Sequence, residues 1–172
     1  MALSSDFTDS RGEEAAPPPL IGALLRVPFE TVRDRMLAGL HARGYSDLVA
    51  AHLTVLQYPG PENQRPSDLA TQTRMSKQAL NYLLGQLERL GYLTRHGDDS
   101  DQRSKRIHLT PRGHAAIKAI REIVREVEAD WEQQLGPGRF AQLRDVLMQL
   151  QAIAAPTGEP ASATSRNRAR DP

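Results

Sequence analysis

The sequence predicts a mainly α-helical fold with one small β-hairpin. Apolar residues recur at helical spacing through most of residues 20–155, whereas one stretch near residue 100 alternates apolar and polar residues on both sides of a charged loop. The two ends, residues 1–19 and 156–172, are rich in Pro, Ser and charged residues, so we expect disordered tails there.

The chain of 172 residues suits one compact domain between these tails, and its net charge of +1 says little by itself about partners. It contains no cysteine, which excludes disulfides, thiolate metal sites and cysteine-based redox sensing. The N-terminus has no apolar signal-peptide core, and no apolar run approaches the roughly 18 residues of a membrane-spanning helix. We therefore expect a cytoplasmic protein that does not span a membrane.

The first two helices are predicted from apolar spacing and from their end signals. The first covers residues 24–40 and ends near Gly44, and Pro28 should start a turn of it or kink it. The second is capped by Ser46 or Asp47 and stops at Pro59-Gly60-Pro61. Its expected buried face consists of Leu48, Ala51, Leu53, Val55 and Leu56.

Two short helices follow, separated by a tight break. The third covers residues 68–73, is capped by Ser67 and turns Leu69 and Ala70 inward. Ser76 caps the fourth, with Met75 and Leu80 at the spacing of a hydrophobic staple. The apolar stripe of the fourth helix consists of Leu80, Leu83, Leu84, Leu87 and Leu90, and Gly91 ends it.

A β-hairpin is predicted next. Two strand-like segments, Leu93-Thr94-Arg95 and Arg106-Ile107-His108-Leu109, flank a loop of small and charged residues that begins at Asp98. We expect the tip to carry Arg103, Lys105 and Arg106. A flexible cationic tip suits a phosphate backbone or a minor groove.

The last two helices carry apolar seams. Thr110 caps the fifth helix, and Pro111 occupies its first position. Its apolar residues recur at spacings of 3, 4, 3 and 4, which predicts packing on another helix; they are Ile117, Ile120, Val124, Val127 and Trp131. After Gly136-Pro137-Gly138, a sixth helix places Phe140, Leu143, Leu147 and Leu150 on one face.

Two short helices, a tight turn and a hairpin together make a winged helix-turn-helix, which we place at residues 46–110. Its second helix can enter the major groove of double-stranded DNA, where Gln and Asn read adenine and Lys contacts guanine or phosphate. The residues expected to face DNA are Arg74, Ser76, Lys77, Gln78, Asn81 and Tyr82. The plainer alternative is a polar face that only meets water.

Residues 46–113 resemble the winged-helix core of the MarR family of transcriptional regulators. The wing motif D-x-R-x-K stands here as Asp101-Gln102-Arg103-Ser104-Lys105, and the following L-T-x-x-G stands as Leu109-Thr110-Pro111-Arg112-Gly113. The recognition-helix ending L-x-x-x-G-hydrophobic matches residues 87–92, and the preceding S-x-L-A pattern matches Ser67-Asp68-Leu69-Ala70. The chain departs from the family in a long linker at residues 59–64 and in Tyr82 and Gly85 on the recognition helix.

The resemblance implies a DNA-binding wing in which Arg103 enters the minor groove and Asp101 braces Arg103 or the wing, with Lys105 and Arg106 beside them. It implies a homodimer built from the first, fifth and sixth helices, in residues 20–45 and 111–155. Such a twofold dimer favours a palindromic operator. Repression is the habit of the family, and many relatives bind a small aromatic ligand between the dimerisation helices and the DNA-binding lobe.

The apolar faces of the first and fifth helices agree with a dimer, because they exceed what one small winged helix covers. The expected interface residues are Leu24, Ile120, Val124, Val127, Trp131, Phe140, Leu147 and Leu150. The alternative is an intramolecular three-helix layer that buries the same residues within one chain.

Other function classes have weaker support. No phosphate-binding loop, nucleophile elbow, zinc-protease motif or dinucleotide fingerprint is present, so we expect no enzyme. The 5 histidines include no pair at i, i+4 spacing, so we expect no metal and no cofactor beyond an effector of unknown identity. The remaining rival is a winged helix that binds another protein and does not bind specific DNA.

Overall fold

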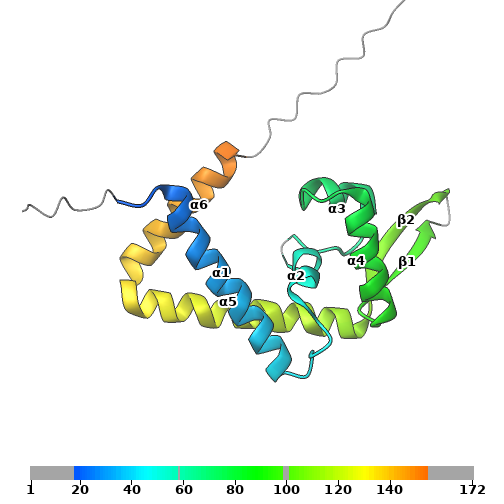
Figure 1. Ribbon diagram of the computed structural model, residues 1–172, viewed down its shortest axis with the longest axis horizontal. Helices are drawn as coiled ribbons and strands as arrows, with labels where there is room; N and C mark the ends of the chain where they lie inside the picture. Colours follow the sequence, from blue (N-terminus) through cyan, green and yellow to red (C-terminus); the bar gives the residue numbers. More distant parts are fainter. Residues whose placement is uncertain (1–17, 58, 99–100, 155–172) are drawn as a thin grey trace, which may run out of the picture. The chain divides into compact units, whose positions relative to one another are not determined.

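The computed structural model describes residues 18–57, 59–98 and 101–154, without the side chains of residues 97–104. The expected tails therefore lie almost wholly outside the described residues. The elements are α1 (Ile21–Ala42), α2 (Ala50–Leu56), α3 (Pro66–Gln72), α4 (Lys77–Arg89), β1 (Leu93–Asp98), β2 (Asp101–Leu109), α5 (Pro111–Leu135) and α6 (Pro137–Ala154). This order confirms the predicted mainly α-helical fold with one hairpin (Figure 1).

The chain divides into two compact units, and the boundary falls within α5. The first unit ends at Arg125 and the second begins at Glu126. None of the helices within the described ranges is both long enough and apolar enough to cross a membrane.

Helix α1 ends as predicted, because Gly44 follows it with a φ of 90° that few other residues adopt. Pro28 lies inside α1, so the helix does not start at this proline. The predicted cap of α2 is wrong: α2 begins at Ala50 and its N-cap is Val49. Asp47 is instead bonded to residues far along the chain, and Ala51, predicted to be buried, is exposed.

The helix-turn-helix is formed by α3 and α4. The predicted Ser67 cap is wrong, because Arg65 is the N-cap of α3 and Pro66 occupies the first position, where its fixed φ suits a helix start. The Ser76 cap of α4 is confirmed, since the Ser76 side chain accepts a hydrogen bond from the backbone N–H of Ala79 at 3.1 Å. Gly91 follows α4 with a φ of 77°, as its end signal predicted.

The hairpin pairs β1 and β2 antiparallel, from Leu93 opposite Leu109 to Gly97 opposite Lys105, and its register shifts near the tip. The predicted loop is too long, because β2 already begins at Asp101. Arg103, Lys105 and Arg106 therefore lie on a strand and not on a free tip. Paired strands satisfy more backbone groups than a long loop would.

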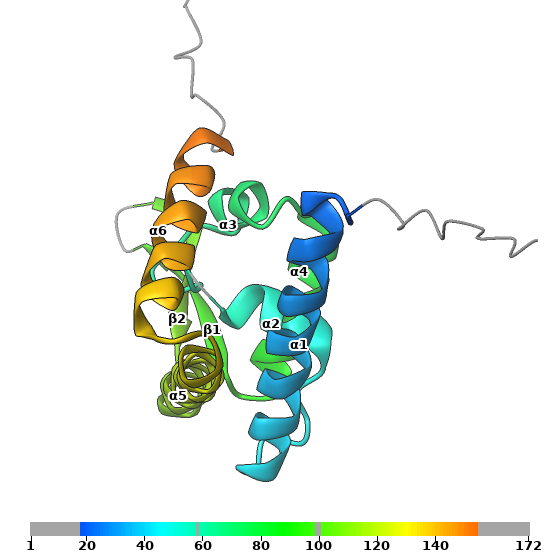
Figure 2. The same ribbon diagram turned by 90° about the vertical axis from the view of Figure 1, so that its left-hand side faces the viewer.

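The core of the first unit joins the hairpin to the helices. Helix α2 packs between α1 and α4, α3 packs on α4 and β2, and α4 packs on β1 (Figure 2). The largest fully buried side chains include Tyr92, Leu40, Leu53, Leu84 and Ile107. Burial of this aliphatic surface stabilises the unit and fixes which face of α4 meets solvent.

Two glycines let elements approach closely. A side chain at Gly113 in α5 would overlap the carbonyl oxygen of Tyr92, and one at Gly39 in α1 would crowd Ile123. The Thr110 cap of α5 is confirmed, since its hydroxyl accepts a hydrogen bond from the N–H of Gly113 at 3.1 Å.

The second unit consists of the end of α5 and all of α6. Gly136, with a φ of 82°, separates the two helices as predicted. Arg144 of α6 donates a hydrogen bond to Glu128 of α5 at 3.0 Å, and its guanidinium lies 5.5 Å from the centre of the Phe140 ring.

Candidate nucleic-acid interface and ligand cavity

Helix α4 separates a leucine face from a polar face. Leu80, Leu83, Leu84 and Leu87 are buried. The residues predicted to face DNA on this helix are all exposed: Ser76, Lys77, Gln78, Asn81 and Tyr82. A helix with one buried stripe must turn its other residues to solvent, so the structure brings these five side chains together on the outer surface of the helix-turn-helix.

Arg74 lies in the turn between α3 and α4. Its backbone has a φ of 54°, in the left-handed region that glycine normally occupies, and its side chain is exposed. This residue lies in the turn, two positions before the Ser76 N-cap of α4. The N-terminal N–H groups of a helix attract anions, and Arg74 adds a full positive charge there.

The wing carries the other predicted cations. Lys105 is exposed on β2, whereas Arg106 is half-buried and donates a hydrogen bond to the carbonyl oxygen of Asn63 at 2.8 Å. The backbone of Asp101 and Arg103 belongs to β2, but their side chains lie outside the described residues. Lys105 and the Arg103 backbone thus lie on the strand, and Arg106 is hydrogen-bonded to Asn63 at the base of the wing.

An ion pair attaches the wing to the recognition helix. Arg95 of β1 donates to the Glu88 carboxylate of α4 through Nη2 at 2.7 Å and Nε at 3.1 Å, and the Arg95 backbone N–H donates at 3.1 Å. These hydrogen bonds from Arg95 hold the pKa of Glu88 below its usual value. The pair fixes the start of the hairpin against the end of α4.

A second polar cluster fixes the start of α5. Asp47 accepts hydrogen bonds from the Tyr92 hydroxyl at 2.6 Å and from Arg112 Nη2 at 2.8 Å. Burial opposes ionisation of Asp47, but the Tyr92 and Arg112 contacts outweigh it and lower the pKa of this carboxyl. The pKa of the Tyr92 hydroxyl is raised by its burial and by Asp47, so this hydroxyl remains a hydrogen-bond donor.

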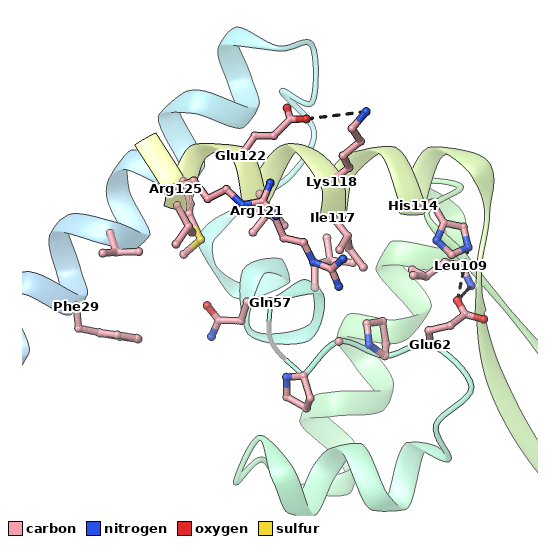
Figure 3. Close-up of a pocket in the computed structure, with 18 residues that line it drawn as sticks. Phe29, Gln57, Glu62, Leu109, His114, Ile117, Lys118, Arg121, Glu122 and Arg125 are labelled. Atoms are coloured by element: carbon pink, nitrogen blue, oxygen red, sulfur yellow. Dashed lines mark hydrogen bonds and ion pairs between the residues drawn. The ribbon is translucent and has the colours of Figure 1, made fainter. Parts of the chain in front are cut away.

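A cavity of about 940 Å³ opens within the first unit (Figure 3). Its walls come from α1, the end of α2, residues 59–62, Leu109 at the end of β2, and α5. Phe29, Val32, Met36, Ile117 and Ile120 supply an apolar lining. An apolar cleft with a few polar groups is typical of small-molecule sites.

The polar lining of the cavity includes four basic residues of α5. His114, Lys118, Arg121 and Arg125 line it from α5, at spacings of 4, 3 and 4 that place them along one side of the helix (Figure 3). Lys118 lies 4.0 Å from Glu122, which also lines the cavity. The side chains of Arg121 and Arg125 make no hydrogen bond or ion pair with any other residue that the structure describes.

The cavity residues were not predicted from the sequence as a site. The spacing of the four basic residues on the fifth helix was a usable signal, because it is helical and lies beside the apolar seam. Glu62 gave no such signal, since its position depends on the path of the linker. Although Glu62 lies near His108 and His114, the described chain offers no set of three or more such side chains able to hold a metal ion.

The residues predicted for a dimer interface fall into two groups. Ile120, Val127 and Phe140 are buried within the single chain, and Val124 and Trp131 are half-buried. Leu24, Leu147 and Leu150 are exposed. Leu24 is accompanied on α1 by exposed Ile21, Leu25 and Phe29, and the two leucines are accompanied on α6 by exposed Leu143, Val146 and Met148.

Comparison with known proteins agrees with this architecture. The model of the MarR family matches residues 49–104. No curated protein sequence matches the chain at a significant level. A solved structure of a Mycobacterium tuberculosis MarR family protein in complex with salicylic acid is similar at 27% identity, with a TM-score of 0.60 over 79% of this chain and 98% of that one.

Two Rhodococcus structures are also similar. CouR from Rhodococcus jostii RHA1, bound to p-coumaroyl-CoA, has 25% identity and a TM-score of 0.62 over 81% of this chain and 95% of that chain. A MarR family transcriptional regulator from Rhodococcus sp. RHA1 has 24% identity and a TM-score of 0.61 over 80% of this chain and 94% of that one. Residues 49–104 of this chain therefore match the MarR family, and the chain has the fold of MarR-family transcription regulators.

Proposed function

We propose that this protein is a sequence-specific regulator that binds double-stranded DNA as a homodimer at a palindromic operator. The observation that carries the proposal is the exposed polar face of α4, with Gln78 and Asn81 at its centre, beside the cationic strand β2. Binding and release of DNA, without catalysis, are the whole of the proposed activity. A protein of this kind acts in the cytoplasm, where the DNA is.

In the proposed complex, α4 lies in the major groove and the wing in the neighbouring minor groove. Gln78 and Asn81 read base edges, while Arg74, Ser76 and Lys77 contact phosphates near the helix start. Tyr82, which is 65% exposed, adds an aromatic contact beside them. Arg103 enters the minor groove with Asp101 bracing the wing, and Lys105 and Arg106 contribute positive charge.

The dimer is proposed from apolar surface that the chain leaves uncovered. On α1 and at its N-cap Leu20, four large apolar side chains are each more than half exposed: Leu20, Ile21, Leu24 and Phe29. On α6, a second set of large apolar side chains is exposed along most of the helix. Contiguous apolar surface of this kind normally marks an interface, and a second copy of the chain offers the matching surface.

The cavity of about 940 Å³ is the proposed site of an effector that relieves repression. Its apolar lining suits an aromatic ring, and the two arginines with no ion pair among the described residues, Arg121 and Arg125, suit a carboxylate or phosphate. The solved relatives bound to salicylic acid and to p-coumaroyl-CoA hold ligands of this chemistry. Small aromatic acids are therefore the first ligands to test.

Fluorescence anisotropy with a duplex chosen by binding-site selection tests the DNA-binding proposal. We expect an affinity that falls steeply with salt, because cationic contacts release counterions, and a loss of about 1–3 kcal/mol for Arg103→Ala. Arg139→Ala, which removes the same charge from α6, serves as the control. Weak binding with no salt dependence would favour the protein-interaction module instead.

A further inference from the structure

The linker between α2 and α3 contacts both the cavity and the wing. Residues 59–62 line the cavity, and they are followed directly by two residues that bond to the wing. We call residues 59–64 the strap. These six residues form the long linker by which the sequence departs from the MarR-family pattern.

The strap forms hydrogen bonds with the edge of β2 that does not pair with β1. The N–H of Asn63 donates to the carbonyl oxygen of Ile107 at 2.8 Å, and the N–H of Ile107 donates to the carbonyl oxygen of Gln64 at 3.0 Å. Arg106 Nη1 adds a bond to the Asn63 carbonyl at 2.8 Å. Ile107 lies opposite Arg95 of β1, so β2 is held by β1 on one side and by the strap on the other.

Glu62 joins the cavity to the wing directly. Its side chain lines the cavity, and its Oε2 accepts a hydrogen bond from the N–H of Leu109 at 2.8 Å. The same carboxylate lies 3.6 Å from His108 Nδ1 on β2. It also lies 3.8 Å from His114 Nε2 on α5 (Figure 3). A ligand that displaces Glu62 therefore removes a bond from the root of β2.

The strap lacks the regular backbone hydrogen bonding of the helical walls of the cavity. Helices α1 and α5 meet at the Gly39–Ile123 contact, and Arg43 Nη1 donates to the Ala119 carbonyl oxygen at 3.0 Å. The strap has no helix or strand of its own, and Gly60 and Asn63 have φ values of 86° and 58°. A non-glycine residue such as Asn63 is held in that region by its surroundings, which here include the bonds to β2 and the bonds of Gln64 to Gly60 and Pro61.

We propose that the strap transmits occupancy of the cavity to the wing: a ligand that fills the cavity displaces residues 59–62 and loosens the bonds of Glu62, Asn63 and Gln64 to β2. Regulation then acts on the orientation of the wing that carries Arg103 and Lys105. This rests on the proposed function of the cavity as an effector site, and it names the element through which that site acts.

The absence of native cysteine allows a direct test without a known effector. Ile117→Cys places one thiol in the cavity wall, and its adduct with N-phenylmaleimide puts an aromatic group into the cavity. Ala115→Cys, exposed on the same helix and outside the cavity lining, carries the same adduct as the control. Mass spectrometry confirms full labelling, and Val32→Cys on α1 replaces Ile117→Cys if that variant does not fold or label.

Hydrogen exchange of the full chain is then followed residue by residue. With the cavity adduct we expect the amides of Asn63, Ile107 and Leu109 to exchange at least about tenfold faster, with no change at the buried α4 residue Leu84 and none with the control adduct. Unchanged or slower exchange at the three amides overturns the proposal, and so does an equal rise at Leu84, which would report global unfolding. The measurement needs no DNA, so its result does not depend on whether the protein binds DNA.

Discussion

The Tyr92 hydroxyl donates a hydrogen bond of 2.6 Å to Asp47, which lies 45 residues earlier in the chain. Arg112 completes the cluster: it bonds to the other Asp47 oxygen, donates to the Leu90 carbonyl oxygen at 2.8 Å, and lies 4.4 Å from the centre of the Tyr92 ring. The segment before α2, the start of the hairpin and the start of α5 are thereby joined at one point. This cluster sets where the wing stands relative to α5.

Removal of the Tyr92 hydroxyl should destabilise the fold. We expect Tyr92→Phe to lower the free energy of unfolding by about 1 kcal/mol, because Asp47 loses one of its two partners while the ring still fills the core. Urea denaturation measures this. Tyr45→Phe is the matched control, since the Tyr45 hydroxyl makes no hydrogen bond with the residues described, and equal effects of the two variants would contradict the role of the cluster.

The Glu88–Arg95 pair should make stability depend on pH. Because Arg95 lowers the pKa of Glu88 in the folded state, the carboxylate stabilises the fold above its usual pKa of 4.5, and this contribution is lost as the pH falls through the lower folded value. We expect Glu88→Gln to be less stable than the parent chain at pH 7 and to lose less stability than the parent below about pH 4.5. Parallel stability curves from pH 7 to pH 3 would rule this out.

The same substitution should have opposite effects at two glycines. Gly85 has open space around a new Cβ, with Arg95 Nη2 nearest at 4.0 Å, so Gly85→Ala should stabilise α4 by roughly 1 kcal/mol. Gly113→Ala should destabilise the chain by about 1–3 kcal/mol, because its Cβ overlaps the Tyr92 carbonyl oxygen. Thermal and chemical denaturation compare them, and a stabilising Gly113→Ala would show that α5 does not approach Tyr92 as described.

Replacement of Arg74 should weaken DNA binding without lowering the free energy of unfolding. Since its φ of 54° suits glycine, we expect Arg74→Gly to keep or raise the free energy of unfolding by up to about 1 kcal/mol. The same variant should bind the selected duplex more weakly and with a smaller salt slope, because one phosphate contact is lost. Anisotropy titrations at several salt concentrations measure both quantities. An unchanged slope would exclude Arg74 from the interface.

Features encoded by neighbouring residues could be predicted from the sequence. The Ser76 and Thr110 caps and the leucine stripe of α4 depend on spacing within one helix, and all are as expected. The role of Asp47 could not be predicted, because a capping residue and a partner of Tyr92 and Arg112 look alike in a linear sequence. The start of β2 at Asp101 depends on pairing with β1, and this tertiary contact overrides the loop-like composition.

The cavity and the strap could not be predicted for a related reason. The cavity walls come from segments between Phe29 and Arg125 that only the fold assembles. The residue composition of the strap correctly indicated a break after α2, but its bonds to Ile107 and Leu109 depend on where the hairpin lies. The sequence thus predicted the exposed polar face of α4 better than it predicted the cavity.

Sequencing the DNA that the purified protein retains from random duplexes tests most directly whether α4 reads a palindromic sequence. We predict enrichment of a palindrome with half-sites about one helical turn apart, and a changed base preference for Gln78→Ala or Asn81→Ala but not for Lys77→Ala. Recovery of no enriched motif, or of the same motif with all three variants, would contradict this role of α4.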